Sequence, residues 1–338
     1  PGRKKTDKYD CDWLRKLHSY GMLNPSFIPE KSIREIKVLT RHRNKLTHEN
    51  NRNVLRMQKS LTLMNFYLHH VVSDITGKTG MNIIHAILNG VADPEELVKH
   101  RNIRIKKSKE EMIKALQGNL QFEHLFILKQ AVESYQHVCN QIEQCDIAIS
   151  DLFSQLKQTN KPHSDDEEKA NQKIDFSNDL INIINVDLLK VPGFNILSIQ
   201  NLISETGTDM SKWEDSKHFT SWLGLAPNNK ITGGKIYNTS TKKINNRASQ
   251  TFRNCANTLR CTKSFLGDFF RRKIARIGYK QALTATARKL SVIYYTMMKN
   301  KIDYIDLGEN YYYEMNKEKV IKKMIKQAEK FGMKLVQN

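Results

Sequence analysis

Two aspartates stand three residues apart near the start of the sequence, in the segment KKTDKYDCDW. On a helix, Asp7 and Asp10 would lie on one face, where two carboxylates give the charge density that a divalent cation needs. Two oxygen ligands make half of a two-metal site, and the one further acid nearby is Asp12. Paired aspartates beside lysines are also typical of a solvated helix start, so both interpretations stay open.

A hydroxyl residue followed by two glycines is the second candidate for chemistry. Gly233 and Gly234 would let a phosphate backbone approach Thr232 closely, and Lys230 and Lys235 could hold its charge. No histidine lies in this loop, so a base arrangement like that of serine proteases has no support. A hydroxyl beside Gly-Gly is also ordinary turn chemistry.

Basic residues follow this loop with few acids to neutralise them. Between Gly224 and Gly278 the one acidic residue is Asp268, and the charges are interleaved with aromatic residues at helical spacing. This asymmetry favours a phosphate-contacting face over a merely solvated one. The predicted contacts after the loop are Lys242, Lys243, Arg247 and Arg253.

Composition points to the same partner. The chain has 338 residues and a formal net charge of +20, so it repels itself unless a polyanion is present. No apolar run approaches the roughly 18 residues of a spanning helix, and no signal-peptide core opens the chain. The five cysteines lack zinc-finger or disulfide spacing. We expect a soluble, cytoplasmic protein with no membrane partner, and DNA or RNA as its first ligand.

Two long helices are predicted to position these residues. Apolar residues fall near heptad spacing from Ser32 toward Ile75, and again from Leu125 to Leu156, broken only by Asp146. Joined by a small helical insertion at 76–119, they predict an antiparallel coiled coil or dimerisation arm over residues 31–156.

The rest of the chain is predicted to be helical as well. A polar linker is expected at 157–178, before a C-terminal domain at 179–338. There, Val191-Pro192-Gly193-Phe194 separates two helices, the second ending at Gly207, in a helix-hairpin-helix-like unit. This unit could offer backbone N–H groups to a phosphate or could simply pack helices together. The segment after Pro227 is expected to be an irregular loop, and because no convincing strand run appears, the fold class is mainly α.

Six ordered segments carry a resemblance to a known family. They are PGRKKTDKYDCDWL at 1–14, SFIPEKSIREIKVLTRHRNKL at 26–46, VPGFNILSIQNLISETGTDMSKW at 191–213, SWLGLAPNNKITGGK at 221–235, NNRASQTFRNCANTLRCTKSFLGDFFRRKIARIG at 245–278, and KQALTATARKLSVIYYTM at 280–297. Together they resemble the DEDD-type transposases of insertion sequences, which are related to the pilin-gene invertase and include the bridge-RNA-guided recombinases. The resemblance covers essentially the whole chain.

The resemblance implies an N-terminal domain of the α/β RuvC-like, or RNase H-like, fold that binds Mg²⁺ through an Asp, a Glu and a closing Asp-x-x-Asp pair. Asp7 and Asp10 look like that closing pair. No strands precede Asp7 in the sequence, and the chain opens at Pro1 without a methionine. Residues 1–30 are therefore expected to be the remnant end of that domain in an N-terminally truncated copy.

The family also carries a serine, shortly after a Gly-Leu-x-Pro turn, that attacks DNA and forms a phosphoserine intermediate. Counting from Gly224-Leu225-Ala226-Pro227, that position is Thr232. Its β-methyl restricts χ1 and crowds in-line attack, so reduced activity is expected. The resemblance implies a recombinase with a structured guide RNA and a homo-oligomer paired through the coiled coil. The alternative is a catalytically inactive nucleic-acid-binding remnant.

Overall fold

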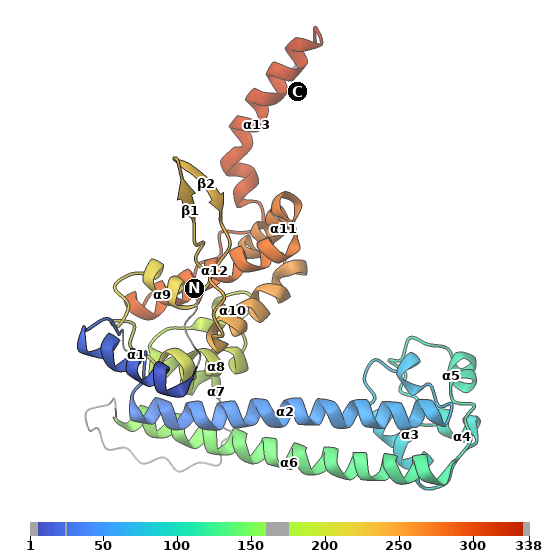
Figure 1. Ribbon diagram of the computed structural model, residues 1–338. Coiled ribbons are helices and arrows are strands. Elements are labelled where there is room, and N and C mark those ends of the chain that lie inside the picture. Colours follow the sequence, from blue (N-terminus) through green and yellow to red (C-terminus); the bar gives the residue numbers. More distant parts are fainter. Residues whose placement is uncertain (1–5, 24–25, 160–175, 334–338) are drawn as a thin grey trace.

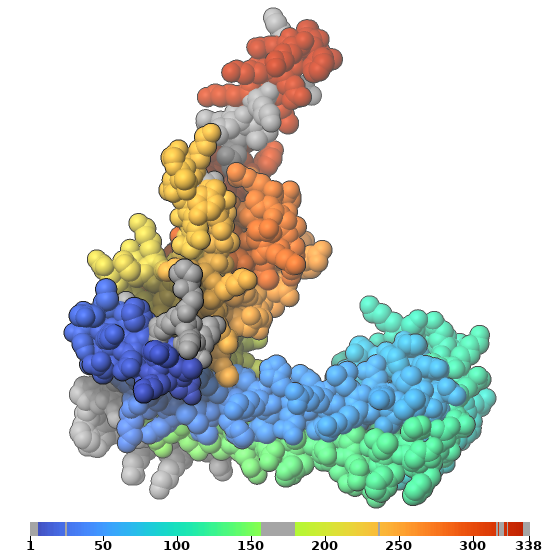
Figure 2. All heavy atoms as spheres, in the orientation of Figure 1, coloured from blue at the N-terminus to red at the C-terminus, as the bar shows by residue number. Residues whose placement is uncertain are grey.

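The computed structural model describes residues 6–23, 26–159 and 176–333. This part of the chain is mainly helical, as predicted, with one pair of short strands among the described residues. Figure 1 shows an extended two-helix arm with the C-terminal helices standing on one of its ends. In the space-filling view of Figure 2 the molecule is therefore L-shaped.

Residues 6–30 contribute one helix, α1 (Asp7–Ser19), among those that the structure describes. The segment after α1 is fastened to the C-terminal helices by Phe27. Its ring centroid lies 4.7 Å from that of Trp213 and 5.4 Å from that of Trp222. The assignment of residues 1–30 to a RuvC-like domain stays a prediction.

The arm consists of α2 (Lys31–Leu63) and α6 (Phe122–Thr159), which lie side by side along their length (Figure 1). Apolar residues such as Leu46, Met57 and Val138 are buried between them. Asp146, which interrupts the apolar pattern of the second helix, accepts hydrogen bonds from the guanidinium of Arg43 on α2. Asp146, which is half-exposed beside the interface, thus has a partner on the facing helix.

The first arm helix ends at Leu63, so the predicted continuation toward Ile75 is wrong. Asn65 adopts a left-handed backbone conformation with φ of 61°, which ends the helix. The backbone then bonds to the insertion, with Tyr67 N–H donating to the Ala115 carbonyl at 2.8 Å. The heptad-like spacing continues past Leu63 because Leu68, Val71 and Ile75 are buried in a separate core.

That second core fills the tip of the arm, residues 64–121. Its elements are η1 (Leu68–His70), α3 (Lys78–Leu88), α4 (Pro94–Val98) and α5 (Lys109–Ala115). Asp93 and Ser108 cap α4 and α5 with their side chains, and Ser108 forms a capping box with Glu111. The tip packs on Leu128 and Val132 near the beginning of α6.

The C-terminal region begins in the described residues with α7. The predicted linker at 157–178 includes the end of α6 and the start of α7, and its residues 160–175 lie outside the described residues. The elements that follow are α7 (Phe176–Ile184), η2 (Leu188–Lys190), α8 (Ile196–Thr206), α9 (Ser216–Trp222), α10 (Arg247–Thr258), η3 (Leu259–Cys261), α11 (Phe265–Ile277), α12 (Tyr279–Asn300) and α13 (Tyr311–Lys330). As predicted, Gly207, with φ of 76°, ends the helix after Pro192-Gly193.

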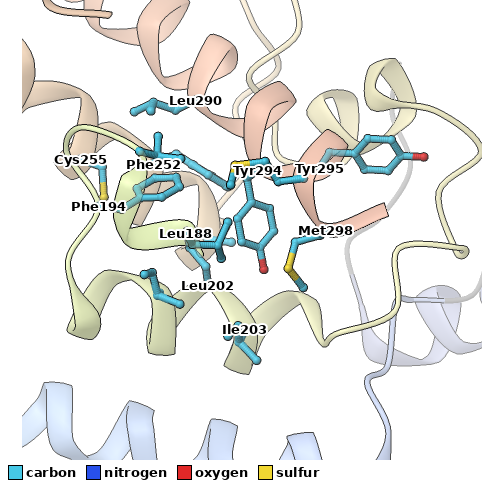
Figure 3. Packing of buried hydrophobic residues seen from close by; sticks show 14 of the residues in the cluster. Leu188, Phe194, Leu202, Ile203, Phe252, Cys255, Leu290, Tyr294, Tyr295 and Met298 are labelled. Carbon is cyan, nitrogen blue, oxygen red and sulfur yellow. The ribbon is translucent and has the colours of Figure 1, made fainter. Parts of the chain in front are cut away.

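One buried tyrosine ties the C-terminal helices together. Tyr294 of α12 lies beside Phe194 and Phe252 (Figure 3). It also packs on Phe219, and its hydroxyl is 2.9 Å from that of Thr206 on α8. Burial raises the pKa of Tyr294, so this hydroxyl stays neutral. The same core includes Ile33, Ile36, Ile149 and Phe153, which anchor the base of the arm to the C-terminal helices.

A β-hairpin stands where an irregular loop was predicted. Strands β1 (Lys230–Thr232) and β2 (Lys235–Asn238) pair antiparallel, with Thr232 opposite Lys235. Gly233 and Gly234 have φ of 55° and 75°, as a two-residue turn between twisted strands requires. The hairpin projects away from the arm (Figure 1).

Candidate nucleic-acid interface

A polar groove lies where α2 of the arm meets α8 and α10, and its volume is about 320 Å³. Three helices contribute its lining: Thr40, Arg41, Asn44, Lys45, Thr47 and His48 from α2, Asn201 and Glu205 from α8, and Arg247, Gln250, Thr251 and Asn254 from α10. Amide, hydroxyl and cationic groups dominate this list. Such groups contact phosphate and sugar in nucleic-acid complexes.

Glu205 supplies the one carboxylate in the lining of this groove. It is buried at the carboxyl-terminal end of α8, and Arg41 donates to both of its oxygens at 2.7 and 2.8 Å. Lys37 adds an ion pair at 3.0 Å. Burial alone would raise the pKa of Glu205, but the hydrogen bonds from Arg41 and Lys37 outweigh it, so the pKa is lowered and the carboxylate stays charged.

A second hollow, of about 530 Å³, continues from the groove and shares Glu205 and Arg247 with it. Its other lining residues are Ser221, Trp222, Lys242, Ile244, Asn245 and Asn246. Asn246 caps α10 by accepting from the Ser249 N–H at 3.2 Å, which fixes the start of the helix that carries Arg247. The structure thus brings two predicted nucleic-acid contacts, Lys242 and Arg247, to one continuous surface.

Cations on this surface are available to an anion. None of the ion pairs in the described residues involves Lys45, Lys242 or Arg247, whereas Arg41 and Lys37 are held by Glu205. A groove with unneutralised cations and many hydrogen-bond donors suits a polyanion.

The remaining predicted contacts lie elsewhere. Lys230, Gly233, Gly234 and Lys235 are exposed on the hairpin, and an added Cβ on either glycine would meet no atom within 4 Å. The turn is therefore open to a large ligand. Lys243 is exposed beside Lys242, whereas Arg253 is half-buried on α10 and lines neither hollow.

Thr232, the predicted nucleophile, is exposed at the end of β1 next to the Gly-Gly turn. Among the hydrogen bonds of the described residues, none involves its hydroxyl. Because Thr232 is exposed, a phosphate could reach it from solvent, and Lys235 lies opposite it in the hairpin.

Asp7 and Asp10 lie in the first turn of α1 and are both exposed. There, acidic side chains stabilise the helix dipole, which accounts for their spacing without a metal. Residues 6–23, 26–159 and 176–333 contain no group of three or more His, Cys, Asp or Glu side chains that could hold a metal ion. In Figure 1, α1 lies beside the base of the arm while the hairpin points away from it.

The Pro192-Gly193 turn packs against α10. A Cβ on Gly193 would lie 2.8 Å from the Cys255 carbonyl oxygen and 3.2 Å from the Leu259 side chain. Asn195 already caps the start of α8, accepting from the Ser198 N–H at 2.8 Å. Of the two interpretations of this unit, helix packing has the structural support.

Sequence reasoning missed the amide side chains and Glu205. Asn44 on α2 donates to the Asn201 side chain on α8 at 2.8 Å, joining the arm to the C-terminal helices. One signal was present in the sequence: Glu205 is the one charged residue of the helix predicted before Gly207. A polar or charged side chain in a helix that is expected to be buried indicates a hydrogen-bond or ion-pair partner on another element.

Part of the chain matches a known protein family. Residues 187–267, about a quarter of the chain, match the family model described as Transposase IS116/IS110/IS902 family. The matched segment runs from η2 into α11, and so includes the hairpin, Glu205 and Arg247. This match supports an insertion-sequence transposase. No curated protein matches the chain.

Proposed function

We propose that the chain is a DNA transposase or site-specific recombinase of an insertion sequence that holds nucleic acid in the groove between the arm and α10. The observation that carries this proposal is the surface on which Lys45, Lys242 and Arg247 lie without an acidic partner among the described residues. The family match over 187–267 supports the same function. Among the described residues, no helix is long and apolar enough to cross a membrane.

In this proposal the Thr232 hydroxyl is the nucleophile. Its oxygen attacks a DNA phosphorus, its proton passes to solvent or a base, and the bond from phosphorus to the departing strand breaks. The DNA becomes attached through a phosphothreonine, and the released strand ends in a hydroxyl. Lys230 and Lys235 on the hairpin would stabilise the charge that develops on the phosphate.

Mg²⁺ is the cofactor that the resemblance implies, and Asp7 and Asp10 alone do not fit it. They are two exposed carboxylates on one helical turn, with no third His, Cys, Asp or Glu grouped with them among the described residues. Two-metal phosphoryl transfer needs more ligands than that. We therefore assign no step of the reaction to a metal held by this pair alone.

A guide RNA and pairing of two copies complete the proposal. The net charge of +20 suits more than one nucleic-acid strand. Along the arm, Val38, Leu55 and Ile147 expose more than half of their surface. Apolar side chains on the outside of a two-helix arm support pairing with a second copy through the arm.

A second candidate function is nucleic-acid binding without cleavage. It is favoured by the Thr232 hydroxyl, to which no described residue is hydrogen-bonded. Attack by a threonine needs a base to take its proton, and none is in place in the described residues.

Binding is tested by fluorescence anisotropy with a labelled DNA duplex over a series of salt concentrations. Lys242→Ala and Arg247→Ala should each weaken binding and lower the salt slope by about 0.9 for each lost phosphate contact. Lys129→Ala is the matched control, since Lys129 is exposed on α6 away from the groove. Equal affinities for all four proteins would overturn the proposed interface.

Cleavage is tested by incubating labelled DNA with the chain and looking for a covalent adduct under denaturing conditions. Transposase chemistry at Thr232 predicts an adduct that is absent in Thr232→Ala and increased in Thr232→Ser, which removes the crowding methyl group. If Thr232→Ser forms an adduct and the wild-type chain does not, the result would favour nucleic-acid binding without cleavage.

A further inference from the structure

A separate hollow of about 310 Å³ lies between α11 and the first turn of α13. Its lining consists of Phe269, Arg272, Lys273, Arg276 and Tyr312, so every lining residue is aromatic or cationic. All five lie beyond the segment that matches the transposase family model.

The three cations are crowded on one helix. Arg272 and Arg276 are four residues apart on α11, and Lys273 is three residues from Arg276, so the charges repel one another along one side. None of them takes part in an ion pair of the described residues, while the neighbouring Arg271 pairs with Glu309 at 2.5 Å. An anion that bound here would relieve the repulsion.

The aromatic side chains of the hollow are held in place by neighbouring residues. Tyr312 stacks on Phe265 with ring centroids 5.0 Å apart and an interplanar angle of 14°. Lys289 of α12 donates to the Tyr312 hydroxyl at 2.8 Å, and its ammonium lies 4.2 and 4.5 Å from the ring centres of Phe265 and Phe269. Burial lowers the pKa of Lys289. The rings themselves are therefore fixed by packing before a ligand binds.

Two of the cations, on long and rotatable side chains, lie close to these rings. The Arg272 guanidinium lies 5.2 Å from the Tyr312 ring centre, and the Lys273 ammonium lies 5.4 Å from that of Phe269. A phosphate would draw both charged ends away from the rings, because an ion pair is stronger than an exposed cation–π contact. That movement would uncover an aromatic surface next to a bound phosphate.

We propose that this hollow binds an unpaired nucleotide of a nucleic-acid strand, with its phosphate on Arg272, Lys273 and Arg276 and its base against Phe269 and Tyr312. The inference rests on the proposed function and adds a single-strand site to it. In a duplex the base faces are already stacked, so a duplex could use the cations but not the rings. The site therefore distinguishes single strands from duplexes.

The test compares affinities of the whole chain for a labelled oligo-dT, an oligo-U of the same length and a DNA duplex. Tyr312→Leu should weaken binding of one or both single strands about tenfold and leave duplex affinity unchanged. Tyr312→Phe keeps the ring and should keep the affinity. Tyr313→Leu is the matched control, since Tyr313 is 62% exposed on the same helical turn and does not line the hollow.

The cations are tested in the same way. Arg272→Ala with Arg276→Ala should weaken single-strand binding and reduce its salt dependence. The inference is overturned if Tyr312→Leu and Tyr313→Leu have equal single-strand affinities, or if Tyr312→Leu weakens duplex and single strand alike. If Arg247→Ala loses duplex binding and keeps single-strand binding, the result concerns the groove of the proposed function and does not contradict the single-strand site. The difference between oligo-dT and oligo-U tells whether DNA or RNA is the better ligand.

Discussion

Arg41 on the arm donates two hydrogen bonds to Glu205 on α8, from Nε to Oε1 at 2.7 Å and from Nη2 to Oε2 at 2.8 Å. The two residues are 164 positions apart in the sequence, and the pair joins the arm to the helices that carry the rest of the groove. Bidentate geometry fixes the direction as well as the distance between the two groups. It therefore sets how α2 lies against α8.

Glu205→Gln should destabilise the chain by about 2 kcal/mol, because Arg41 and Lys37 would lose their anionic partner at a largely buried position. Urea unfolding followed by circular dichroism measures the change. Glu133→Gln is the control, since Glu133 is exposed on α6 and should change stability by less than about 0.5 kcal/mol. Equal midpoints for the two variants would contradict a structural role for the pair.

The same pair predicts a pH dependence. The pKa of Glu205 is lowered from its ordinary value of 4.5, so the folded chain binds fewer protons there than the unfolded chain. Its contribution is complete above that value and is lost as the pH falls through the lower folded pKa. The stability difference between wild type and Glu205→Gln should therefore shrink as the pH is lowered below the ordinary value. Other carboxylates titrate in both proteins and cancel, so a constant difference would argue against this assignment.

Gly193→Ala should be more destabilising than Gly90→Ala. Both glycines have nearly the same left-handed backbone, with φ of 92° and 90°, so each substitution carries about 1 kcal/mol of strain. Only at Gly193 would the new Cβ meet the Cys255 carbonyl, at 2.8 Å, while at Gly90 it would meet no atom within 4 Å. We expect an additional loss of about 1–3 kcal/mol from this close contact. Thermal unfolding of the two variants gives the comparison, and similar melting temperatures would mean that the turn does not depend on contact with α10.

Gly233→Val with Gly234→Val should disrupt the hairpin locally. Valine at a left-handed position costs roughly 1–2 kcal/mol, and the hairpin turn makes no close contacts that could compensate. We expect the unfolding midpoint of the chain to stay near that of wild type while duplex affinity falls, because Lys230 and Lys235 lose their fixed positions. Gly90→Val introduces the same kind of strain at one position of the arm tip and serves as the control. A reduced affinity in that control as well would point to a global effect.

Much of the helical order could be predicted from the sequence, since it depends on local signals. Gly207 ends α8 where predicted, and the second arm helix was predicted within three residues at each end. The first arm helix was predicted too long because apolar spacing indicates burial and does not tell whether the buried residue lies in a helix or in a turn. Leu68 and Val71 are buried after the helix has ended. In the structure, the left-handed backbone of Asn65 marks the end of the helix.

The hairpin and the groove were harder to predict for different reasons. The hairpin strands are three and four residues long, too short for a periodic pattern, although Gly-Gly between Ile231-Thr232 and Lys235-Ile236 was a usable turn signal. Lys242 and Arg247 were predicted as contacts from charge alone. Their meeting with Asn44 and Lys45 depends on how α2 lies across α8, a long-range relationship that spacing along the chain does not encode.

The arm is fastened to the C-terminal helices near its base, through Ile33, Ile36 and the Arg41–Glu205 pair, and its tip carries a core of its own. The helix α2 has 33 residues and is about 50 Å long, so a rotation at its attached end moves the other end over a large distance. A tilt of about 10° at the base would carry the tip through about 9 Å, given that length. Small changes in the contact beside the groove are thereby magnified into displacements at the far end as large as the width of a helix.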